Sequence, residues 1–135
     1  LFGSRALKSL SLIDISQIDF ALNLDMIGRN PDNPIMIYGD GFAEGLGDIA
    51  EEHATANDTR ITLMGKRYQP FSDFVIFHDS KIPYLMLFTG EHEDYHGTGD
   101  HSDRLDYFRM EKVVGLSYDI LVHLANMDRI PRFSR

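Results

Sequence analysis

The sequence contains no cysteine among its 135 residues. This absence excludes disulfide frameworks, thiolate metal ligands and cysteine nucleophiles. Tryptophan is also missing, and no apolar run approaches the length of about 20 residues that crosses a bilayer. Basic residues are in the minority, with 13 Lys and Arg against 21 Asp and Glu and a formal net charge of −8. This acidic balance argues against a nucleic-acid backbone or an anionic membrane as the main partner.

The rest of the composition is that of a globular domain. Apolar residues make up 43% of the chain and charged residues 25%, and 135 residues fit a single domain. Apolar stretches alternate with segments of helical spacing, and we find neither a linker nor a repeat between them. We expect strands at 18–27, 35–38, 60–64 and 82–89, and helices at 3–10, 42–56, 108–126 and from an N-cap at Ser72 and Asp73.

Strands that alternate with helices indicate an α/β layered fold. The strands at 18–27 and 82–89 are almost entirely apolar, apart from Asn23 and Asp25, which is typical of strands buried on both faces. The last helix carries a stripe that we expect to be buried, formed by Met110, Val113, Val114, Ser117, Ile120, Leu121 and Leu124. Four short strands and three full helices are few for a covered free-standing sheet, so the sequence predicts part of a larger fold.

Asp25 is the first residue that departs from a plain structural pattern. A buried carboxylate is costly unless it is paired or bound to a metal. Asp25 stands near the end of an apolar strand, just before Gly28. One interpretation is a carboxylate that caps a neighbouring turn. The other is a ligand, because open α/β sheets bind ligands beyond the carboxyl ends of their strands.

The segment 90–101 is the second such feature. It follows an apolar strand directly, and three of the six histidines fall in it beside four carboxylates. Imidazole and carboxylate are the ligands that zinc takes where no thiol is available. A solvated polar loop is the alternative, and the density of histidine at the end of a strand favours a metal site.

The segment 92–96 also matches the metalloprotease pattern H-E-x-x-H. That pattern works on a helix, whereas Gly90 precedes this segment and Gly97 and Gly99 follow it, so we interpret the match as coincidental. The remaining histidines fall on predicted helices, where we expect them to pack or face solvent rather than bind a metal: His53, His78 and His123.

Three groups of residues resemble the zinc aminopeptidases of peptidase family M28. The segment 23–29 (NLDMIGR) resembles a strand of that family with the same letters. Three short segments resemble a run of motifs in the same family: 72–73 (SD) resembles its S-D-H, 82–83 (IP) its G-I-P, and 88–90 (FTG) its F-F-T-G. The segment 93–107 resembles its D-Y-H-x-x-x-D-x-x-D-K-I-x-Y segment, and order and spacing agree over nearly the whole chain.

The resemblance implies a site with two zinc ions. It makes Asp25 a ligand of one zinc and His96 a ligand of the other. It gives Tyr95 the role of stabilising the tetrahedral intermediate, as a donor aimed at charge that develops in the transition state. A zinc pair would polarise the scissile carbonyl and lower the pKa of a bridging water.

Four further residues take supporting roles by the same resemblance. Asp100 matches an acidic family position that supports the site from behind the metal ligands. Met26, Ser72 and Asp73 would line the substrate pocket. Phe74 stands where many members have histidine, so any role of that histidine is lost here.

The resemblance also implies the architecture and the activity. We expect a three-layer αβα sandwich with a mostly parallel or mixed sheet, in which 1–135 is the C-terminal portion of a single peptidase domain. The family's H-x-D pair, bridging Asp and adjacent Glu residues would precede Leu1. We therefore expect a zinc exopeptidase that releases N-terminal residues from peptides, inactive as this chain alone. Family habit favours a secreted or periplasmic bacterial protein.

Two alternatives remain open. One is a glutaminyl-cyclase-like acyltransferase with a single zinc, against which Phe74 counts. The other is a non-catalytic peptidase-like module. The presence of Asp25, Tyr95 and His96 counts against that module, because a protein without catalysis has no need of them.

Overall fold

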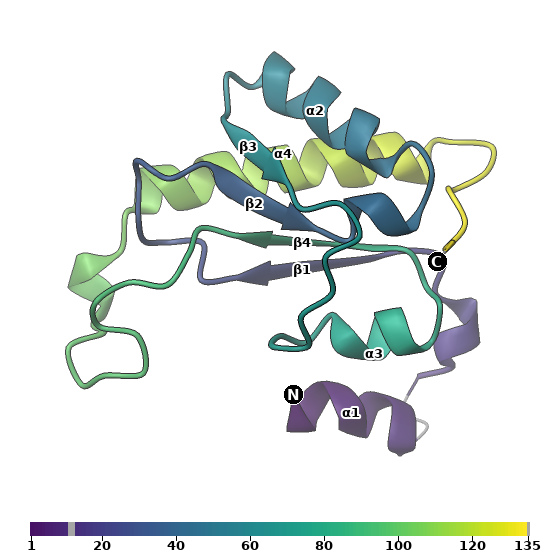
Figure 1. Cartoon of the computed structure of the whole chain (residues 1–135), viewed down its shortest axis with the longest axis horizontal. Coiled ribbons are helices and arrows are strands. Elements are labelled where there is room, and N and C mark those ends of the chain that lie inside the picture. The colour runs from purple at the N-terminus through teal and green to yellow at the C-terminus, as the bar shows by residue number, and fades with distance from the viewer. Residues whose placement is uncertain (11–12, 135) are drawn as a thin grey trace.

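The computed structural model describes residues 1–10 and 13–134 (Figure 1). Its regular elements follow in chain order: α1 (Phe2–Ser9), β1 (Ala21–Asp25), β2 (Ile35–Tyr38), α2 (Leu46–Ala56), β3 (Ile61–Leu63), α3 (Val75–Asp79), β4 (Tyr84–Phe88) and α4 (Tyr107–Ala125). Short 3₁₀ turns lie at Ile15–Gln17, Asp40–Phe42 and Ser102–Arg104. Each predicted strand and helix is present, with ends that shift by a few residues.

The four strands form one mixed sheet in the order β1-β4-β2-β3. β1 runs parallel to β4, and β2 runs parallel to β3, while β2 and β4 are antiparallel. β1 and β4 consequently end at the same side of the molecule, where the chain leaves β4 in a long loop (Figure 1). This confirms the predicted mixed sheet.

Helices cover both faces of the sheet (Figure 1). α2 and α4 lie on one face, and α3 lies on the other with α1 packed outside it. The central strand β4 is buried along its whole length, as predicted. Because side chains alternate across a strand, Leu85 and Leu87 join the core under α2 and α4, whereas Tyr84, Met86 and Phe88 join the core on the α3 side. The three-layer αβα arrangement is confirmed.

The expectation for the first strand was wrong in part. We predicted a strand over 18–27 buried on both faces, but β1 covers only Ala21–Asp25 and Leu24 is 38% exposed. β1 lies at an edge of the sheet and pairs with β4 alone in this chain. Its apolar residues are therefore not all buried on both faces of the sheet.

The predicted N-cap at Ser72 and Asp73 was also wrong. α3 begins after Phe74, and no side chain caps it. The side chains of Ser72 and Asp73 bind Asp25 and Ser4 instead. Phe74 is fully buried and stacks on Tyr84, with 5.0 Å between ring centroids, so the position after Ser-Asp packs into the core.

The predicted helix over 42–56 begins only at Leu46. Phe42 belongs to a separate 3₁₀ turn, and Gly45 between them has a φ of +85°. Only glycine adopts this left-handed conformation without a steric penalty, so Gly45 sets the start of α2.

The last helix has nearly the predicted bounds, but part of its predicted stripe is exposed. Val113, Ser117, Ile120 and Leu124 are buried as expected, whereas Val114 is 49% and Leu121 is 40% exposed. Leu116, which the pattern did not include, is fully buried. Residues at the spacing 113, 116/117, 120 and 124 share a single helix face, and Val114 and Leu121 lie beside it.

A buried carboxylate joins the ends of β2 and β3. Asp40 follows β2, and its Oδ1 accepts hydrogen bonds from the backbone N–H groups of Met64 and Gly65 at 3.2 and 3.0 Å. Burial raises the pKa of Asp40, and these backbone donors act in the opposite direction.

In the part of the chain that the structure describes, no helix is both long and apolar enough to span a bilayer.

Candidate metal site at the carboxyl ends of β1 and β4

Asp25 and the histidine-rich loop lie at the same edge of the sheet. Asp25 is the last residue of β1 and stands opposite Phe88, the last residue of β4. The loop 90–106 continues directly from that end of β4 and extends past the sheet (Figure 1). The parallel pairing therefore places the two features that the sequence singled out at the same edge of the sheet.

The carboxylate of Asp25 is held by a short chain of hydrogen bonds. Ser72 donates its hydroxyl to Asp25 Oδ2 at 2.6 Å, and Asn23 Nδ2 donates to that hydroxyl at 2.7 Å. Ser72 is buried, so its geometry is fixed. This explains both polar residues of β1. In the described part of the chain, Oδ1 of Asp25 has no hydrogen-bond partner. This oxygen is therefore free to bind a metal ion.

Met26 lies directly beyond the strand end in a strained backbone conformation. Its φ is +51°, which is uncommon for a residue with a side chain, and His96 has a similar φ of +56°. The buried hydroxyl of Thr89 donates to the carbonyl of Met26 at 2.5 Å. The ends of β1 and β4 are thus locked together, and two of the predicted site residues carry the kind of backbone strain that clusters at functional sites.

Ion pairs organise the loop 90–106. Asp94 accepts hydrogen bonds of 2.7 Å from both Arg29 and Arg104, and Arg29 also pairs with Asp100 at 3.1 Å. The hydrogen bond from Arg29 is the main reason that the pKa of Asp94 is lowered. Arg29 follows β1, so these pairs fasten the loop to the strand that carries Asp25. Sequence reasoning missed this network.

The two ends of the loop are anchored to the turn that follows β1. Asn30 Nδ2 donates to the carbonyls of Thr89, Gly90 and Glu91 at 3.2, 3.0 and 3.0 Å. At the other end, the N–H of Asp106 donates to the carbonyl of Gly28 at 2.8 Å. A Cβ on Gly28 would lie 2.8 Å from a methyl carbon of Leu105 and 2.9 Å from the sulfur of Met110, so a side chain there would displace these two side chains.

Tyr95 and His96 lie on the exposed part of the loop. Their rings stack with 3.9 Å between centroids, and Tyr95 is 40% exposed. The segment 92–96 forms a turn rather than a helix, which confirms that its match to H-E-x-x-H is coincidental. Within the described residues, the imidazole nitrogens of His96 have no hydrogen-bond partner.

The other predicted site residues have partners of their own. Asp100 binds Arg29 as described above. Asp73 accepts a hydrogen bond of 2.7 Å from Ser4 on α1, which lowers the pKa of Asp73. His92, which was not among the predicted site residues, has a side chain that is only 5% exposed. Its Nε2 lies 3.9 Å from Asp100 Oδ1, and its buried Nδ1 has no hydrogen-bond partner among the described residues. Support of the metal by Asp100, and the pocket roles of Met26, Ser72 and Asp73, stay predictions.

The donor atoms fit zinc in kind but fall short in number. The carboxylate of Asp25 and the imidazole of His96 are both ordinary zinc ligands with a free donor atom. Protein zinc sites use three or four such ligands. Among residues 1–10 and 13–134, no group of three or more His, Asp or Glu side chains is placed to hold a metal.

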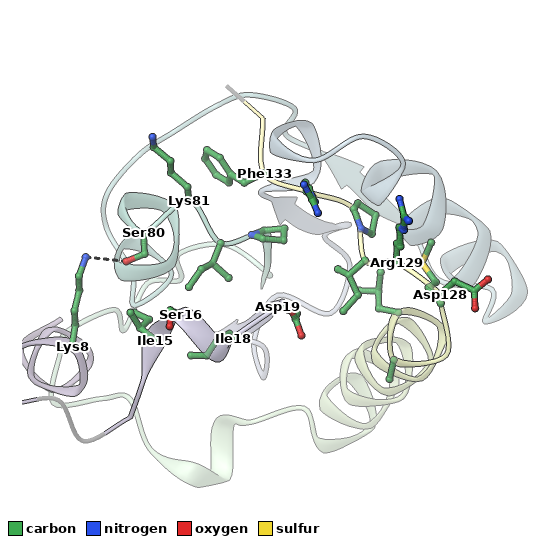
Figure 2. A pocket seen from close by; sticks show the side chains of 18 residues that line it. Lys8, Ile15, Ser16, Ile18, Asp19, Ser80, Lys81, Asp128, Arg129 and Phe133 are labelled. Atoms are coloured by element: carbon green, nitrogen blue, oxygen red, sulfur yellow. Dashed lines mark hydrogen bonds between the residues drawn. The ribbon is translucent and has the colours of Figure 1, made fainter.

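A large open hollow of about 1120 Å³ lies at the opposite end of β1 and β4 (Figure 2). It is lined by Ile18 and Asp19 before β1, by Ile82 and Pro83 before β4, and by residues 124–125 and 127–133, which end and follow α4. None of the predicted site residues lines it, so this hollow is separate from the candidate metal site.

Comparison with protein families gives a match over most of the chain. Residues 1–120 match the sequence profile of Peptidase family M28. The chain belongs to peptidase family M28. This confirms the resemblance that the motifs at 23–29 and 93–107 indicated. Comparison of the M28 chain with curated protein sequences gives no significant match.

Three solved structures similar to this M28 chain are described as aminopeptidases. The aminopeptidase from Aneurinibacillus sp. strain AM-1 has 16% identity and a TM-score of 0.73, over 99% of this chain and 31% of that one. BSAP, a zinc aminopeptidase from Bacillus subtilis, has 16% identity and a TM-score of 0.71, over 98% and 35%. LapA aminopeptidase from Legionella pneumophila has 16% identity and a TM-score of 0.68, over 91% and 34%.

At this identity the likeness shows the fold, and it confirms the expected aminopeptidase-type α/β architecture. The M28 chain spans about a third of the length of these structures.

Proposed function

We propose that this M28 chain forms part of a zinc-dependent aminopeptidase in which Asp25 and His96 bind the metal. The observation that carries the proposal is the placement of Asp25 and of the loop with His96 after two adjacent parallel strands. Both side chains present an unused donor atom there. The family match and the aminopeptidase neighbours support a peptidase.

In this proposal, Ser72 and Asn23 orient the metal-binding carboxylate. The hydrogen bond from Ser72 occupies Asp25 Oδ2, so Oδ1 is the atom left to bind zinc. Such hydrogen bonds behind a ligand fix its direction and strengthen metal binding. Zinc bound there would supply a Lewis acid for the peptide carbonyl and a water of lowered pKa.

We further propose that Tyr95 contributes a hydrogen-bond donor to the reaction. Its ring lies against His96, so its hydroxyl extends from the same exposed part of the loop as a metal ligand. A phenolic O–H close to the metal can donate to the oxygen that gains negative charge when water attacks the peptide carbonyl.

The remaining zinc ligands and the general base belong, in our proposal, to a part of the domain outside this chain. Two ligands are fewer than a zinc site needs, and the neighbours are about three times longer than the matched region. The complete site would hold two zinc ions and act on peptides, and the 135-residue chain alone would be inactive.

The test uses the complete parent domain. Asp25→Ala should lower the bound zinc and the release of N-terminal residues from peptides together, while Glu52→Ala on the exposed face of α2 should change neither. Full activity and full zinc content in Asp25→Ala would remove Asp25 from the site. A wild-type stoichiometry of one zinc, with cyclisation of N-terminal glutamine, would instead indicate a glutaminyl-cyclase-like enzyme.

A further inference from the structure

We propose that His53 and His123 form a binding site for a divalent transition-metal ion between α2 and α4, independent of the site at Asp25. His53 Nε2 lies 2.9 Å from His123 Nδ1. The two rings are nearly perpendicular, at 85°, with centroids 5.1 Å apart. Both side chains are half-buried, so solvent reaches the pair while the helices restrict the rings.

The spacing of the two nitrogens matches neighbouring coordination positions on one ion. At the metal–nitrogen distance of about 2.0–2.1 Å that imidazole takes, a separation of 2.9 Å corresponds to an angle of about 90° at the ion. Square-planar and octahedral ions use this angle, whereas a tetrahedral ion needs nitrogens about 3.3 Å apart. The separation in the metal-free chain therefore places both nitrogens within reach of one ion, and among divalent first-row metals Cu²⁺ is the one that such nitrogen ligands bind most tightly.

A second polar pair fixes the separation of the helices. Asn57, one turn beyond His53, donates its Nδ2 to Asp119 Oδ2 at 2.9 Å and to the carbonyl of His53 at 2.8 Å. Asp119 lies one turn before His123, so the helices run antiparallel and the two pairs stack. Asp119 also places a negative charge within one turn of His123, which favours a bound cation.

The C-terminal ends of α2 and α4 also favour a bound cation. His53 lies in the last turn of α2 and His123 in the last turn of α4. The carbonyl groups that end a helix carry partial negative charge, which stabilises a cation nearby. Both imidazoles are thus presented at helix ends that attract an ion, in a chain whose formal net charge is −8.

Metal binding would replace the hydrogen bond between the rings. In the metal-free form one neutral ring donates its N–H to the other. When the ion binds, that proton moves to the outer nitrogen of the same ring, and both inner nitrogens become ligands. No group of three or more ligating side chains forms among the described residues, so water would fill the other positions.

The test measures Ni²⁺ and Cu²⁺ binding to the tag-free chain by calorimetry. It uses a His96→Gln background, so that the proposed zinc ligand does not contribute. One ion should bind per chain, and both His53→Gln and His123→Gln should weaken binding about tenfold or more. His101→Gln, which removes an exposed imidazole from the loop 90–106, should leave the affinity unchanged.

Unchanged affinity in both His53→Gln and His123→Gln would overturn the proposal, as would the absence of binding to the His96→Gln chain. If the two glutamine variants fail to fold, paramagnetic broadening of backbone amide signals by Cu²⁺ decides the question. Broadening centred on residues near His53 and His123 supports the site, and broadening centred elsewhere overturns it. Because the site is independent of Asp25, neither result depends on the proposed peptidase activity.

Discussion

Ser72 donates its hydroxyl to the carboxylate of Asp25 at 2.6 Å, across 47 residues of sequence. Ser72 is buried and itself accepts a hydrogen bond from Asn23, so the serine joins both polar residues of β1 to the chain before α3. This contact explains how an apolar strand tolerates a carboxylate at its end. The fixed hydroxyl of Ser72 donates to Oδ2 of Asp25, and Oδ1 stays free to bind a ligand.

Ser72→Ala should weaken zinc binding in the complete domain by about 10–100-fold, because loss of a hydrogen bond behind a metal ligand has that effect. Equilibrium dialysis against a zinc chelator measures it. Ser80→Ala is the matched control, since within the described residues the Ser80 hydroxyl accepts a hydrogen bond from the exposed Lys8 side chain alone. Equal zinc affinities for the two variants would show that Ser72 does not orient Asp25.

Leu116→Ala should lower the free energy of unfolding of this chain by about 2–5 kcal/mol, because it leaves a cavity in the core. Leu121→Ala on the same helix should cost about 0.5 kcal/mol or less, because Leu121 is 40% exposed. Urea denaturation of both variants tests the assignment of the buried helix face. The opposite order would mean that the predicted stripe, and not the observed one, faces the sheet.

Asp40 should make the chain more stable as the pH falls. Burial raises the pKa of Asp40 in the folded state above the unfolded value of about 3.9. The folded state therefore binds the proton first, and stability is gained as the pH falls through the folded pKa. Each unit of difference between the folded and unfolded pKa changes the free energy of unfolding by about 1.4 kcal/mol.

The measurement compares the wild-type chain with Asp40→Asn from pH 7 to pH 4. The unfolding free energy of the wild type minus that of the variant should increase toward low pH. A constant difference would contradict the raised pKa. Asp58→Asn, at an exposed position, serves as the control.

Arg29→Gln should raise the pKa of Asp94, since the hydrogen bond from Arg29 is the main cause of its lowering. A lowered carboxyl pKa contributes stability above the unfolded value, and this contribution is lost as the pH falls through the folded pKa. Carboxyl carbon chemical shifts, followed through an acid titration, report the pKa directly. Arg67→Gln, at an exposed position, should leave it unchanged, and an unchanged value in Arg29→Gln would exclude the ion pair.

Much of the fold could be predicted because local signals agree with the tertiary structure. β4 is apolar at every position and is buried at every position, and α4 shows helical spacing over its full length. β1 shows where such reasoning stops. Its pattern resembles that of β4, but burial depends on which strands lie beside it, and β1 lies at an edge.

The site was predictable only to the level of its chemistry. A carboxylate at a strand end and a histidine-rich loop are visible in the sequence, and the parallel pairing of β1 and β4 places them at one edge. The residues that hold them were not visible. Arg29 and Asp94 pair across 65 residues, and neither departs from the pattern of a polar loop. The contact between His53 and His123 was not visible either, because 70 residues separate them. From the sequence we expected each to pack or face solvent rather than to bind a metal.

The parallel pairing of β1 and β4 also makes the surroundings of Asp25 depend on contacts that are distant in the sequence. The hydrogen bond from Thr89 to Met26 spans 63 residues, and the intervening chain must form β2, α2, β3 and α3. Contacts of such long range close late, because the entropy of the enclosed chain is lost before they form. The contacts that pack α4 on α2 span a similar range, with His53 and His123 70 residues apart. We therefore expect the surroundings of Asp25 to form late, together with the packing of α4, so that the proposed metal-binding geometry exists only in the fully folded chain.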